Sequence, residues 1–162
     1  MIQTMKSVKR VSFEDCDPFS HLNNANYLTY FLNAREEQLR TNGVLNIFEH
    51  AVETGKSWAV VCHRIKYLKP SRLGEELEIW TRMLTYDAFR NLVEFVMLCP
   101  KKKQLKSVML TEFAYFSIKK SKPVKMDKEM RKLLKKISLF PETDLASFRL
   151  ADRIQQIKSE IR

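Results

Sequence analysis

The sequence predicts an α+β fold in which one strongly curved antiparallel sheet wraps around a long central helix. A stretch from about Asn24 to Arg40 is apolar on most sides in its first half, which is typical of a buried helix. Further along the chain, four runs with the composition and two-residue alternation of strands lie between Trp58 and Ile118. Curving the sheet around the helix is the simplest way to bury that helix.

The first elements follow in order along the chain. Residues 5–13 have the pattern of a short strand, and the polar, turn-prone residues 14–23 form a loop. The central helix starts at asparagine, whose side chain caps free N–H groups, and Asn42 and Gly43 mark its end. Its second half, from Arg35 onward, is polar, so we expect it to reach the surface.

The middle of the chain is rich in strands. The connections between them, PSRLG, TYDA and PKKKQ, are short, whereas a parallel crossover needs about a dozen residues or more. We therefore expect each strand to lie antiparallel beside the next one in the sequence. A short helix is expected over 44–53, and the strands over 58–68, 76–83, 89–98 and 105–118.

The C-terminal part is predicted to be helical, over 126–137 and 145–161, with Pro141 between the two helices. We divide the chain into a main domain, residues 1–125, and a helical extension, residues 126–162, which packs on the same domain or on its partner. Because exposed sheet edges are often covered by a second subunit, we expect a homodimer or a homotetramer.

Length and composition exclude several classes of protein. A chain of 162 residues and 19.2 kDa suggests one domain. No apolar run approaches the ~20 residues that cross a bilayer, and the first ten residues lack the apolar core of a secretory signal. Cys16, Cys62 and Cys99 are odd in number and widely spaced, which argues against a disulfide framework. We expect a cytoplasmic protein.

The net charge of +10 is concentrated in one segment. Residues 101–136 carry thirteen Lys or Arg against three acidic side chains, and the rest of the chain is balanced. Such a segment attracts phosphates, an acidic protein or anionic lipid. The alternative is a solvated hairpin tip and the polar face of a helix.

The densest polar cluster directly precedes the central helix. A helix N-terminus offers free N–H groups and partial positive charge, which can polarise a carbonyl oxygen. Asp17, held in direction by Pro18, is the best-placed carboxylate to attack such a carbonyl or to deprotonate water. The alternative is that these residues simply cap the helix. The sequence has no HExxH, CxxC, GxSxG or Walker motif, so we expect no metal or other cofactor. The cluster consists of Glu14, Asp15, Asp17, His21, Asn23 and Asn24.

Residues 15–40, DCDPFSHLNNANYLTYFLNAREEQLR, resemble the signature of the hotdog-fold acyl-CoA thioesterases of the 4-hydroxybenzoyl-CoA thioesterase type. A second stretch, IKYLKPSRLGEELEIWTRM, is similar to the family's strand that ends in Tyr-x-x-Pro before a Leu-Gly-acidic turn. The resemblance covers about residues 5–120. The signature positions are met by Asp15, Asp17, His21, Asn23, Asn24, Tyr27, Ala34 and Arg35.

The resemblance implies a hotdog fold and assigns roles to residues. Asp17 matches the catalytic carboxylate, acting as a nucleophile or as a general base for water. The N–H at Asn24 matches the group that polarises the thioester carbonyl, and Tyr27 matches a tyrosine that lines the pocket. The remaining substrate-binding candidates are His21, Asn23, His63 and Tyr67, the last two contributed across a subunit interface. The candidates for CoA phosphates are Lys69, Arg72, Arg90 and Lys119.

This chain departs from the family pattern at Ser20, where the family has glycine, so a loop that needs positive φ there would be strained. Some relatives instead use a glutamate on the central helix, for which Glu36 and Glu37 are candidates. The leading hypothesis is hydrolysis of an acyl thioester, of CoA or of acyl-carrier protein. The alternatives are a dehydratase, a non-catalytic acyl-CoA-binding or regulatory protein, and nucleic-acid binding, which rests on charge alone.

Overall fold

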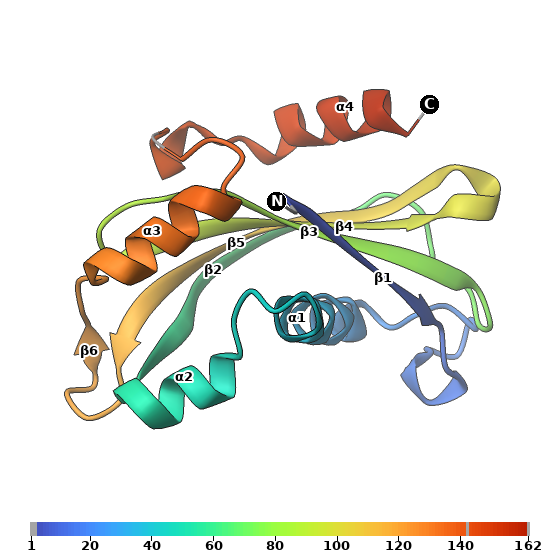
Figure 1. The fold of residues 1–162 in the computed structure, drawn as a ribbon. Helices are drawn as coiled ribbons and strands as arrows, with labels where there is room; N and C mark the ends of the chain where they lie inside the picture. The colour runs from blue at the N-terminus through green and yellow to red at the C-terminus, as the bar shows by residue number, and fades with distance from the viewer. Residues whose placement is uncertain (1–2, 142, 162) are drawn as a thin grey trace.

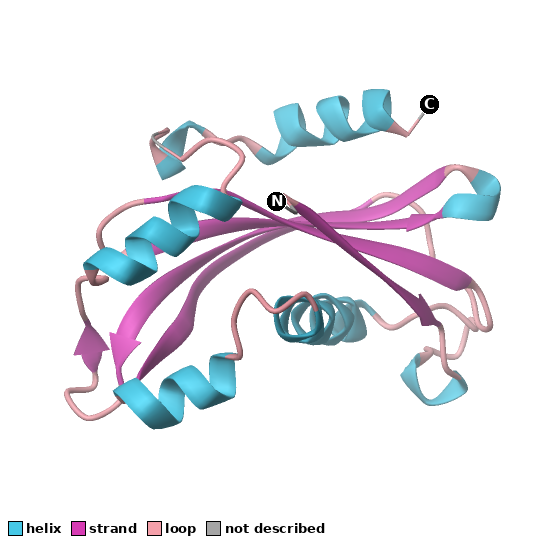
Figure 2. Cartoon of the chain, viewed as in Figure 1, coloured by secondary structure: helices cyan, strands magenta, loops and turns pink. Residues whose placement is uncertain are grey.

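A curled antiparallel sheet with one long helix in its hollow forms the body of the protein (Figures 1 and 2). The computed structural model describes residues 3–141 and 143–161. The predicted α+β class is confirmed. The elements are β1 Thr4–Arg10, α1 Asn24–Thr41, α2 Ile47–Thr54, β2 Lys56–Tyr67, β3 Glu76–Tyr86, β4 Arg90–Cys99, β5 Gln104–Ser117, β6 Lys122–Pro123, α3 Lys128–Ile137 and α4 Leu150–Glu160.

The strand order is β1-β3-β4-β5-β2, with β6 paired to β5. All of these pairings are antiparallel, and β3, β4 and β5 are neighbours as the short connections predict. The expectation that β2 and β3 are neighbouring strands is wrong, because β4 and β5 lie between them. Strands β2 and β3 are three strand spacings apart, which is about 14 Å. The connection between them, residues 68–75, can span about 26 Å when extended. A short loop can therefore cross the end of the sheet, and β2 becomes an edge strand.

Helix α1 fills the concave side of the sheet. Phe31 is fully buried against Phe95, with ring centroids 5.5 Å apart. The polar second half of α1 reaches the surface as expected on one side, where Glu37 and Arg40 are exposed, whereas Arg35, Gln38 and Leu39 are buried. Polar partners make this burial possible, because Gln38 Nε2 donates to the carbonyl oxygen of Ile79 (3.1 Å).

The two C-terminal helices lie in different places. Helix α3 packs against the end of the same core, and α4 lies across the opposite, outer face of the sheet (Figure 1). The predicted helix over 145–161 is wrong in its first turns, because residues 145–147 form a separate 3-10 turn and α4 begins only at Leu150. Ile154 and Ile157 bury the apolar stripe of α4 against the sheet.

The basic segment is divided by the fold. Lys101, Lys102 and Lys103 lie at the β4–β5 connection, whereas the lysines from Lys119 onward follow the other end of β5. Strand β5 has 14 residues, so about 45 Å of strand, measured along its curve, lies between the two groups. No helix among residues 3–141 and 143–161 is long and apolar enough to span a membrane.

Candidate active site

Asp17 lies in a tight loop that fixes one of its carboxylate oxygens. Oδ1 accepts hydrogen bonds from the backbone N–H groups of Phe19 (2.9 Å) and His21 (3.1 Å). The backbone N–H of Asp17 in turn donates to the carbonyl oxygen of His21 (2.7 Å). Oδ2 makes no hydrogen bond within the described chain. The loop therefore orients the carboxylate and leaves one oxygen available.

Ser20 has the left-handed backbone conformation, with φ of 58°. The family pattern has glycine at this position, and the structure gives the physical reason, because the turn around Asp17 needs positive φ. A non-glycine residue there carries strain of about 1 kcal/mol or more. The loop keeps its conformation despite the serine.

The two sequence motifs meet in space. The N–H of Leu22 donates to the carbonyl oxygen of Ser71 (2.8 Å), and the N–H of Leu73 donates to that of Ser20 (3.0 Å). Tyr27 ties the helix to the same connection, since its hydroxyl accepts from the N–H of Ser71 (3.1 Å). Ser71 is fully buried and was not predicted as a site residue. Its position in the second motif, between Pro70 and Arg72, is the sequence feature that could have indicated it.

The first turn of α1 lines a cleft of about 230 Å³. Asn23 caps the helix by accepting from the N–H of Ala25 (3.0 Å), so its side chain serves the helix. The N–H of Asn24 has no hydrogen-bond partner in the part of the chain that the structure describes. The cleft brings together six of the predicted residues: Asp17, His21, Asn24, Tyr27, Tyr67 and Lys69.

Tyr67 closes this cleft from β2. Its hydroxyl donates to the carbonyl oxygen of Asn24 (3.1 Å), and its ring meets that of Tyr27 edge-on at 5.1 Å. Burial, and then the neighbouring Tyr27, raise the pKa of Tyr67. Tyr67 is therefore a neutral hydrogen-bonding group at physiological pH.

Other predicted residues lie outside the cleft of their own chain. His63 Nδ1 is 2.8 Å from Thr111 Oγ1, and burial lowers the pKa of His63, so the ring is neutral at pH 7. Arg90 pairs with Asp87 and Glu112 at the far end of the sheet, the end that also holds Lys119.

The exposed Arg72 lies beside the loop, in a backbone bridge with His21. On the central helix, Glu36 pairs with Arg40, 3.4 Å away, and Glu37 lines a separate hollow beside β1. Neither glutamate lines the cleft of Asp17.

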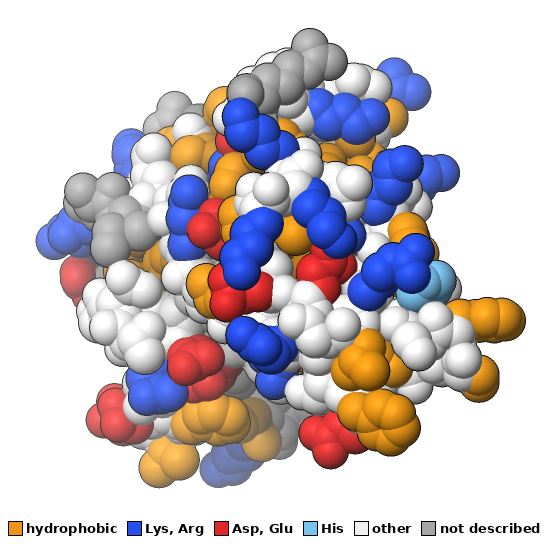
Figure 3. Space-filling model, turned by 90° about the vertical axis from the view of Figure 1, so that its right-hand side faces the viewer, with side chains coloured by type: hydrophobic (Ala, Val, Ile, Leu, Met, Phe, Trp, Pro, Cys, Tyr) orange, Lys and Arg blue, Asp and Glu red, His pale blue; other side chains and the backbone are white. Residues whose placement is uncertain are grey.

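A basic groove adjoins the cleft. Lys69 and Leu68 line both, and the groove adds Lys103 from the β4–β5 connection and Lys158 from α4. Figure 3 shows the end of the molecule, where Lys and Arg cover the upper part and hydrophobic side chains gather below. Lys103 and Lys158 were not predicted as site residues, because only the fold brings them to Lys69.

Glu75 holds the connection that supports the loop. Burial raises its pKa, but hydrogen bonds from Lys106, the N–H of Arg72 and Lys102 outweigh this and lower the pKa to about 2. A carboxylate with a lowered pKa stabilises the fold above its unfolded pKa of about 4.3, and that contribution is lost as the pH falls toward 2. We expect Glu75→Gln to flatten the loss of stability between pH 4.5 and pH 2, which urea unfolding at a series of pH values measures.

Glu76 supplies the matched control for this experiment. Its carboxylate pairs at 3.9 Å with the exposed Arg10, so Glu76→Gln should leave the acid dependence of stability unchanged. An unchanged acid dependence in Glu75→Gln would contradict the role given to Glu75.

The residues described, 3–141 and 143–161, contain no cluster of three or more His, Cys, Asp or Glu side chains that could hold a metal ion. The chemistry available in the cleft is that of a carboxylate, tyrosine hydroxyls and the free N–H groups of a helix N-terminus. Such a set can polarise a carbonyl group and direct an oxygen nucleophile at it.

Comparisons with known proteins identify the class of protein to which this chain belongs. The fold is the hotdog fold, and residues 11–134 match the model of the thioesterase-like superfamily. The chain belongs to that superfamily. A search of curated proteins finds no match.

Solved structures with the same fold include the probable thioesterase YbaW from Escherichia coli, with TM-score 0.70 and 23% identity over 82% of this chain and 98% of that one. Slr0204, a 1,4-dihydroxy-2-naphthoyl-CoA thioesterase from Synechocystis, has TM-score 0.73 and 15% identity over 82% and 96%. SAV2348 from Staphylococcus aureus, solved in complex with CoA, has TM-score 0.76 and 14% identity over 91% and 94%.

Proposed function

We propose that this protein hydrolyses acyl-CoA thioesters to a free acid and CoA. The observation that carries the proposal is the cleft at the start of α1, where the oriented carboxylate of Asp17 and the free N–H of Asn24 line one space. Membership of the thioesterase-like superfamily and the CoA complex of SAV2348 support it.

The N–H of Asn24 stabilises the negative charge that develops on the thioester oxygen, aided by the partial positive charge of the helix N-terminus. Oδ2 of Asp17 either attacks the carbonyl carbon or removes a proton from the attacking water. On the first route an anhydride forms and CoA thiolate leaves, and water then releases the acid. On the second route hydroxide adds directly, and the thiolate leaves as the tetrahedral intermediate collapses.

The basic groove beside the cleft is proposed to hold the phosphates of CoA through Lys69, Lys103 and Lys158. We expect Lys69→Ala to raise KM for an acyl-CoA about 10-fold with kcat nearly unchanged, because one charge-assisted contact is worth about 1.4 kcal/mol or more. The effect should shrink at high salt. Steady-state kinetics at two ionic strengths test this. Lys119→Ala, at the other end of the sheet, is the control; a larger rise in KM for it would contradict the placement.

We propose that two copies associate through the open edge of β2. This strand has 12 residues, against 7 in the other edge strand, β1, and it exposes two consecutive apolar side chains, Val60 and Val61, by 44% and 56% of their surface. Lysines introduced together at Val60 and Val61 should convert the dimer to monomers, measured by sedimentation velocity. Val8→Lys on β1, the other edge strand, should leave the dimer intact. A wild-type monomer would contradict the proposal.

The experiment that tests the function is release of CoA from a panel of short, long and aromatic acyl-CoAs. Cys62 is exposed and therefore accessible to thiol reagents, so the acid product should be measured by mass spectrometry in parallel. Turnover that depends on Asp17 supports the proposal. Saturable binding of acyl-CoA without turnover would overturn it in favour of a binding or regulatory protein.

A further inference from the structure

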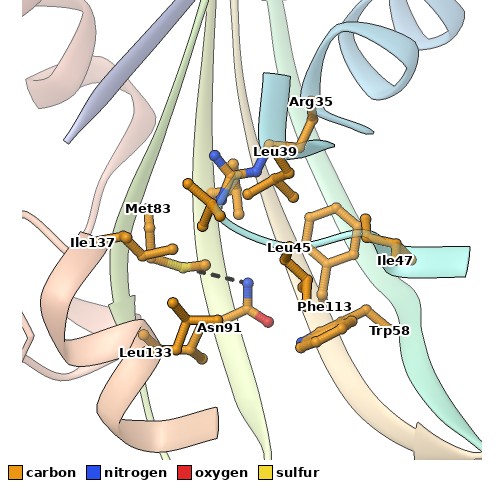
Figure 4. Close-up of a pocket in the computed structure, with 13 residues that line it drawn as sticks. Arg35, Leu39, Leu45, Ile47, Trp58, Met83, Asn91, Phe113, Leu133 and Ile137 are labelled. Atoms are coloured by element: carbon orange, nitrogen blue, oxygen red, sulfur yellow. Dashed lines mark hydrogen bonds between the residues drawn. The ribbon is translucent and has the colours of Figure 1, made fainter. Parts of the chain in front are cut away.

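A second space, apart from the cleft of Asp17, lies between α1, α3 and the sheet. It has a volume of about 60 Å³, room for the last few heavy atoms of a chain. Its walls are almost entirely apolar and come from α1, α3, the α1–α2 loop and the sheet, with Leu39, Leu45, Trp58 and Phe113 among them. Two polar side chains, Arg35 and Asn91, face into it (Figure 4).

Arg35 is a buried cation without a carboxylate partner. It is 6% exposed, and Nη1 donates to Thr81 Oγ1 (3.1 Å) and contacts Met5 Sδ (3.9 Å). Within the described residues no acidic side chain pairs with it. Burial lowers the pKa of Arg35 to about 10, and no acidic side chain contributes to the shift. Burying an unpaired charge costs several kcal/mol, so an anion or an oxygen acceptor bound beside the Arg35 guanidinium would be strongly stabilised.

Asn91, on β4, adds a second unmet polar group. Its Oδ1 is buried without a hydrogen-bond partner, and its Nδ2 donates only to Met83 Sδ (3.4 Å). Figure 4 shows this amide beside the apolar side chains of the cavity, with Arg35 entering from α1. The amide can present either its oxygen or its nitrogen by rotation, so it can bind a hydroxyl or a carboxylate.

Strand β2 contributes a residue to this cavity and a residue to the cleft of Asp17. Trp58 lines the cavity and Tyr67 lines the cleft. The irregularity between Val60 and Cys62 places both on the same face of the strand. Helix α1 makes its main sheet contacts with β1 and β3, which leaves this side of β2 only partly covered.

The distance between the two sites defines the length of chain that fits. Eleven residues of α1 separate Asn24 from Arg35, which is about 16 Å along the helix axis. An extended chain advances about 1.2 Å for each bond. A chain of roughly twelve to fourteen carbons would therefore reach from the cleft to Arg35.

We propose, building on the thioester hydrolysis proposed above, that this cavity receives the far end of a medium-length acyl chain and that Arg35 selects chains ending in a carboxylate. The substrate class is then the mono-CoA thioesters of dicarboxylic acids. A chain that ends in a hydroxyl can hydrogen-bond to the same polar groups but does not neutralise the charge, so it ranks second as a substrate. A chain that ends in a methyl group leaves both polar groups unpaired, so it ranks last.

The kinetic test compares dodecanedioyl-CoA, 12-hydroxydodecanoyl-CoA and dodecanoyl-CoA. We expect kcat/KM of the wild type to favour the first over the last at least 10-fold. Arg35→Met keeps the length of the side chain and removes its charge, and it should abolish or reverse this preference. Arg35→Lys should restore part of it. Arg40→Met, at an exposed position on the same helix, should leave it unchanged. Equal or better turnover of dodecanoyl-CoA by the wild type would overturn the proposal.

A binding experiment separates this proposal from the proposed hydrolysis. Trp58 and Trp80 are the two tryptophans of the chain, so Trp80→Phe leaves Trp58 as the single reporter at the cavity. Monomethyl dodecanedioate should change its fluorescence saturably, and methyl 12-hydroxydodecanoate should bind more weakly. Adding Arg35→Met should remove the difference. If the carboxylate ester binds but no thioester is turned over, the proposed role of the cavity is supported and the proposed hydrolysis is not. If neither ester changes the fluorescence, the cavity holds water only and the inference is overturned.

Discussion

Asp17→Asn is expected to lower kcat for acyl-CoA hydrolysis by about 10²- to 10⁴-fold while the protein stays folded. The asparagine side chain keeps an oxygen that can accept the hydrogen bonds from the N–H groups of Phe19 and His21. It loses the negative charge that either catalytic route requires. The loop should therefore keep its geometry, and only the chemistry should fail.

The measurement is the rate of acid release under saturating substrate, together with the melting temperature and the Kd for CoA of each variant. Asp17→Ala is the matched comparison, because it removes both the charge and the acceptor of the turn. It should lose activity and also lower the melting temperature. Full activity in Asp17→Asn, with a normal melting temperature, would remove Asp17 from the mechanism.

The second large effect is expected on stability. Glu94 is fully buried on the outer side of β4, where both of its oxygens accept from Arg153 (2.6 and 3.0 Å). Arg82 lies 3.4 Å from the same carboxylate and also pairs with Glu160, in the last turn of α4. Glu94→Leu should lower the free energy of unfolding by about 3–5 kcal/mol, because it leaves two buried guanidinium groups without this partner.

Urea unfolding measures this change, and limited proteolysis within α4 shows whether the helix detaches. The control is Glu36→Ala, which breaks the exposed pair with Arg40 and should change stability by less than about 0.5 kcal/mol. Pairing Glu94→Leu with Arg153→Met should recover part of the loss, since apolar groups can replace a buried ion pair. A loss below about 1 kcal/mol in Glu94→Leu would contradict the role of the ion-pair network.

The features that the sequence predicted well are those set by local chemistry. The start of α1 follows from Asn23, whose side chain is an ordinary helix cap, and the turn around Asp17 from short-range hydrogen bonds. The grouping of Asp17 with Tyr27 follows from one motif, whereas Tyr67 was expected to come from the partner subunit and instead lines the cleft of its own chain. Their roles in catalysis stay predictions until the variants are measured.

The features that the sequence did not reveal depend on distant parts of the chain. The position of β2 beside β5 is decided by the curl of the whole sheet, and loop length alone cannot give it. Polar residues such as Arg35 and Gln38 are placed inside because Thr81 and Ile79, over forty residues away, supply partners. Likewise, Lys158 joins Lys69 only once α4 has docked.

The place of β2 in the sheet also has a consequence for the nascent chain. Strand β2 pairs with β5 from Tyr67↔Ser107 to Lys56↔Ser117, so it has no partner strand when it leaves the ribosome. At ordinary rates of translation, fifty residues take roughly 3 to 10 s to synthesise. During that interval the apolar side of α1 and the valines of β2 are exposed together. The chain is therefore expected to be most prone to aggregation before Ser117 has been made.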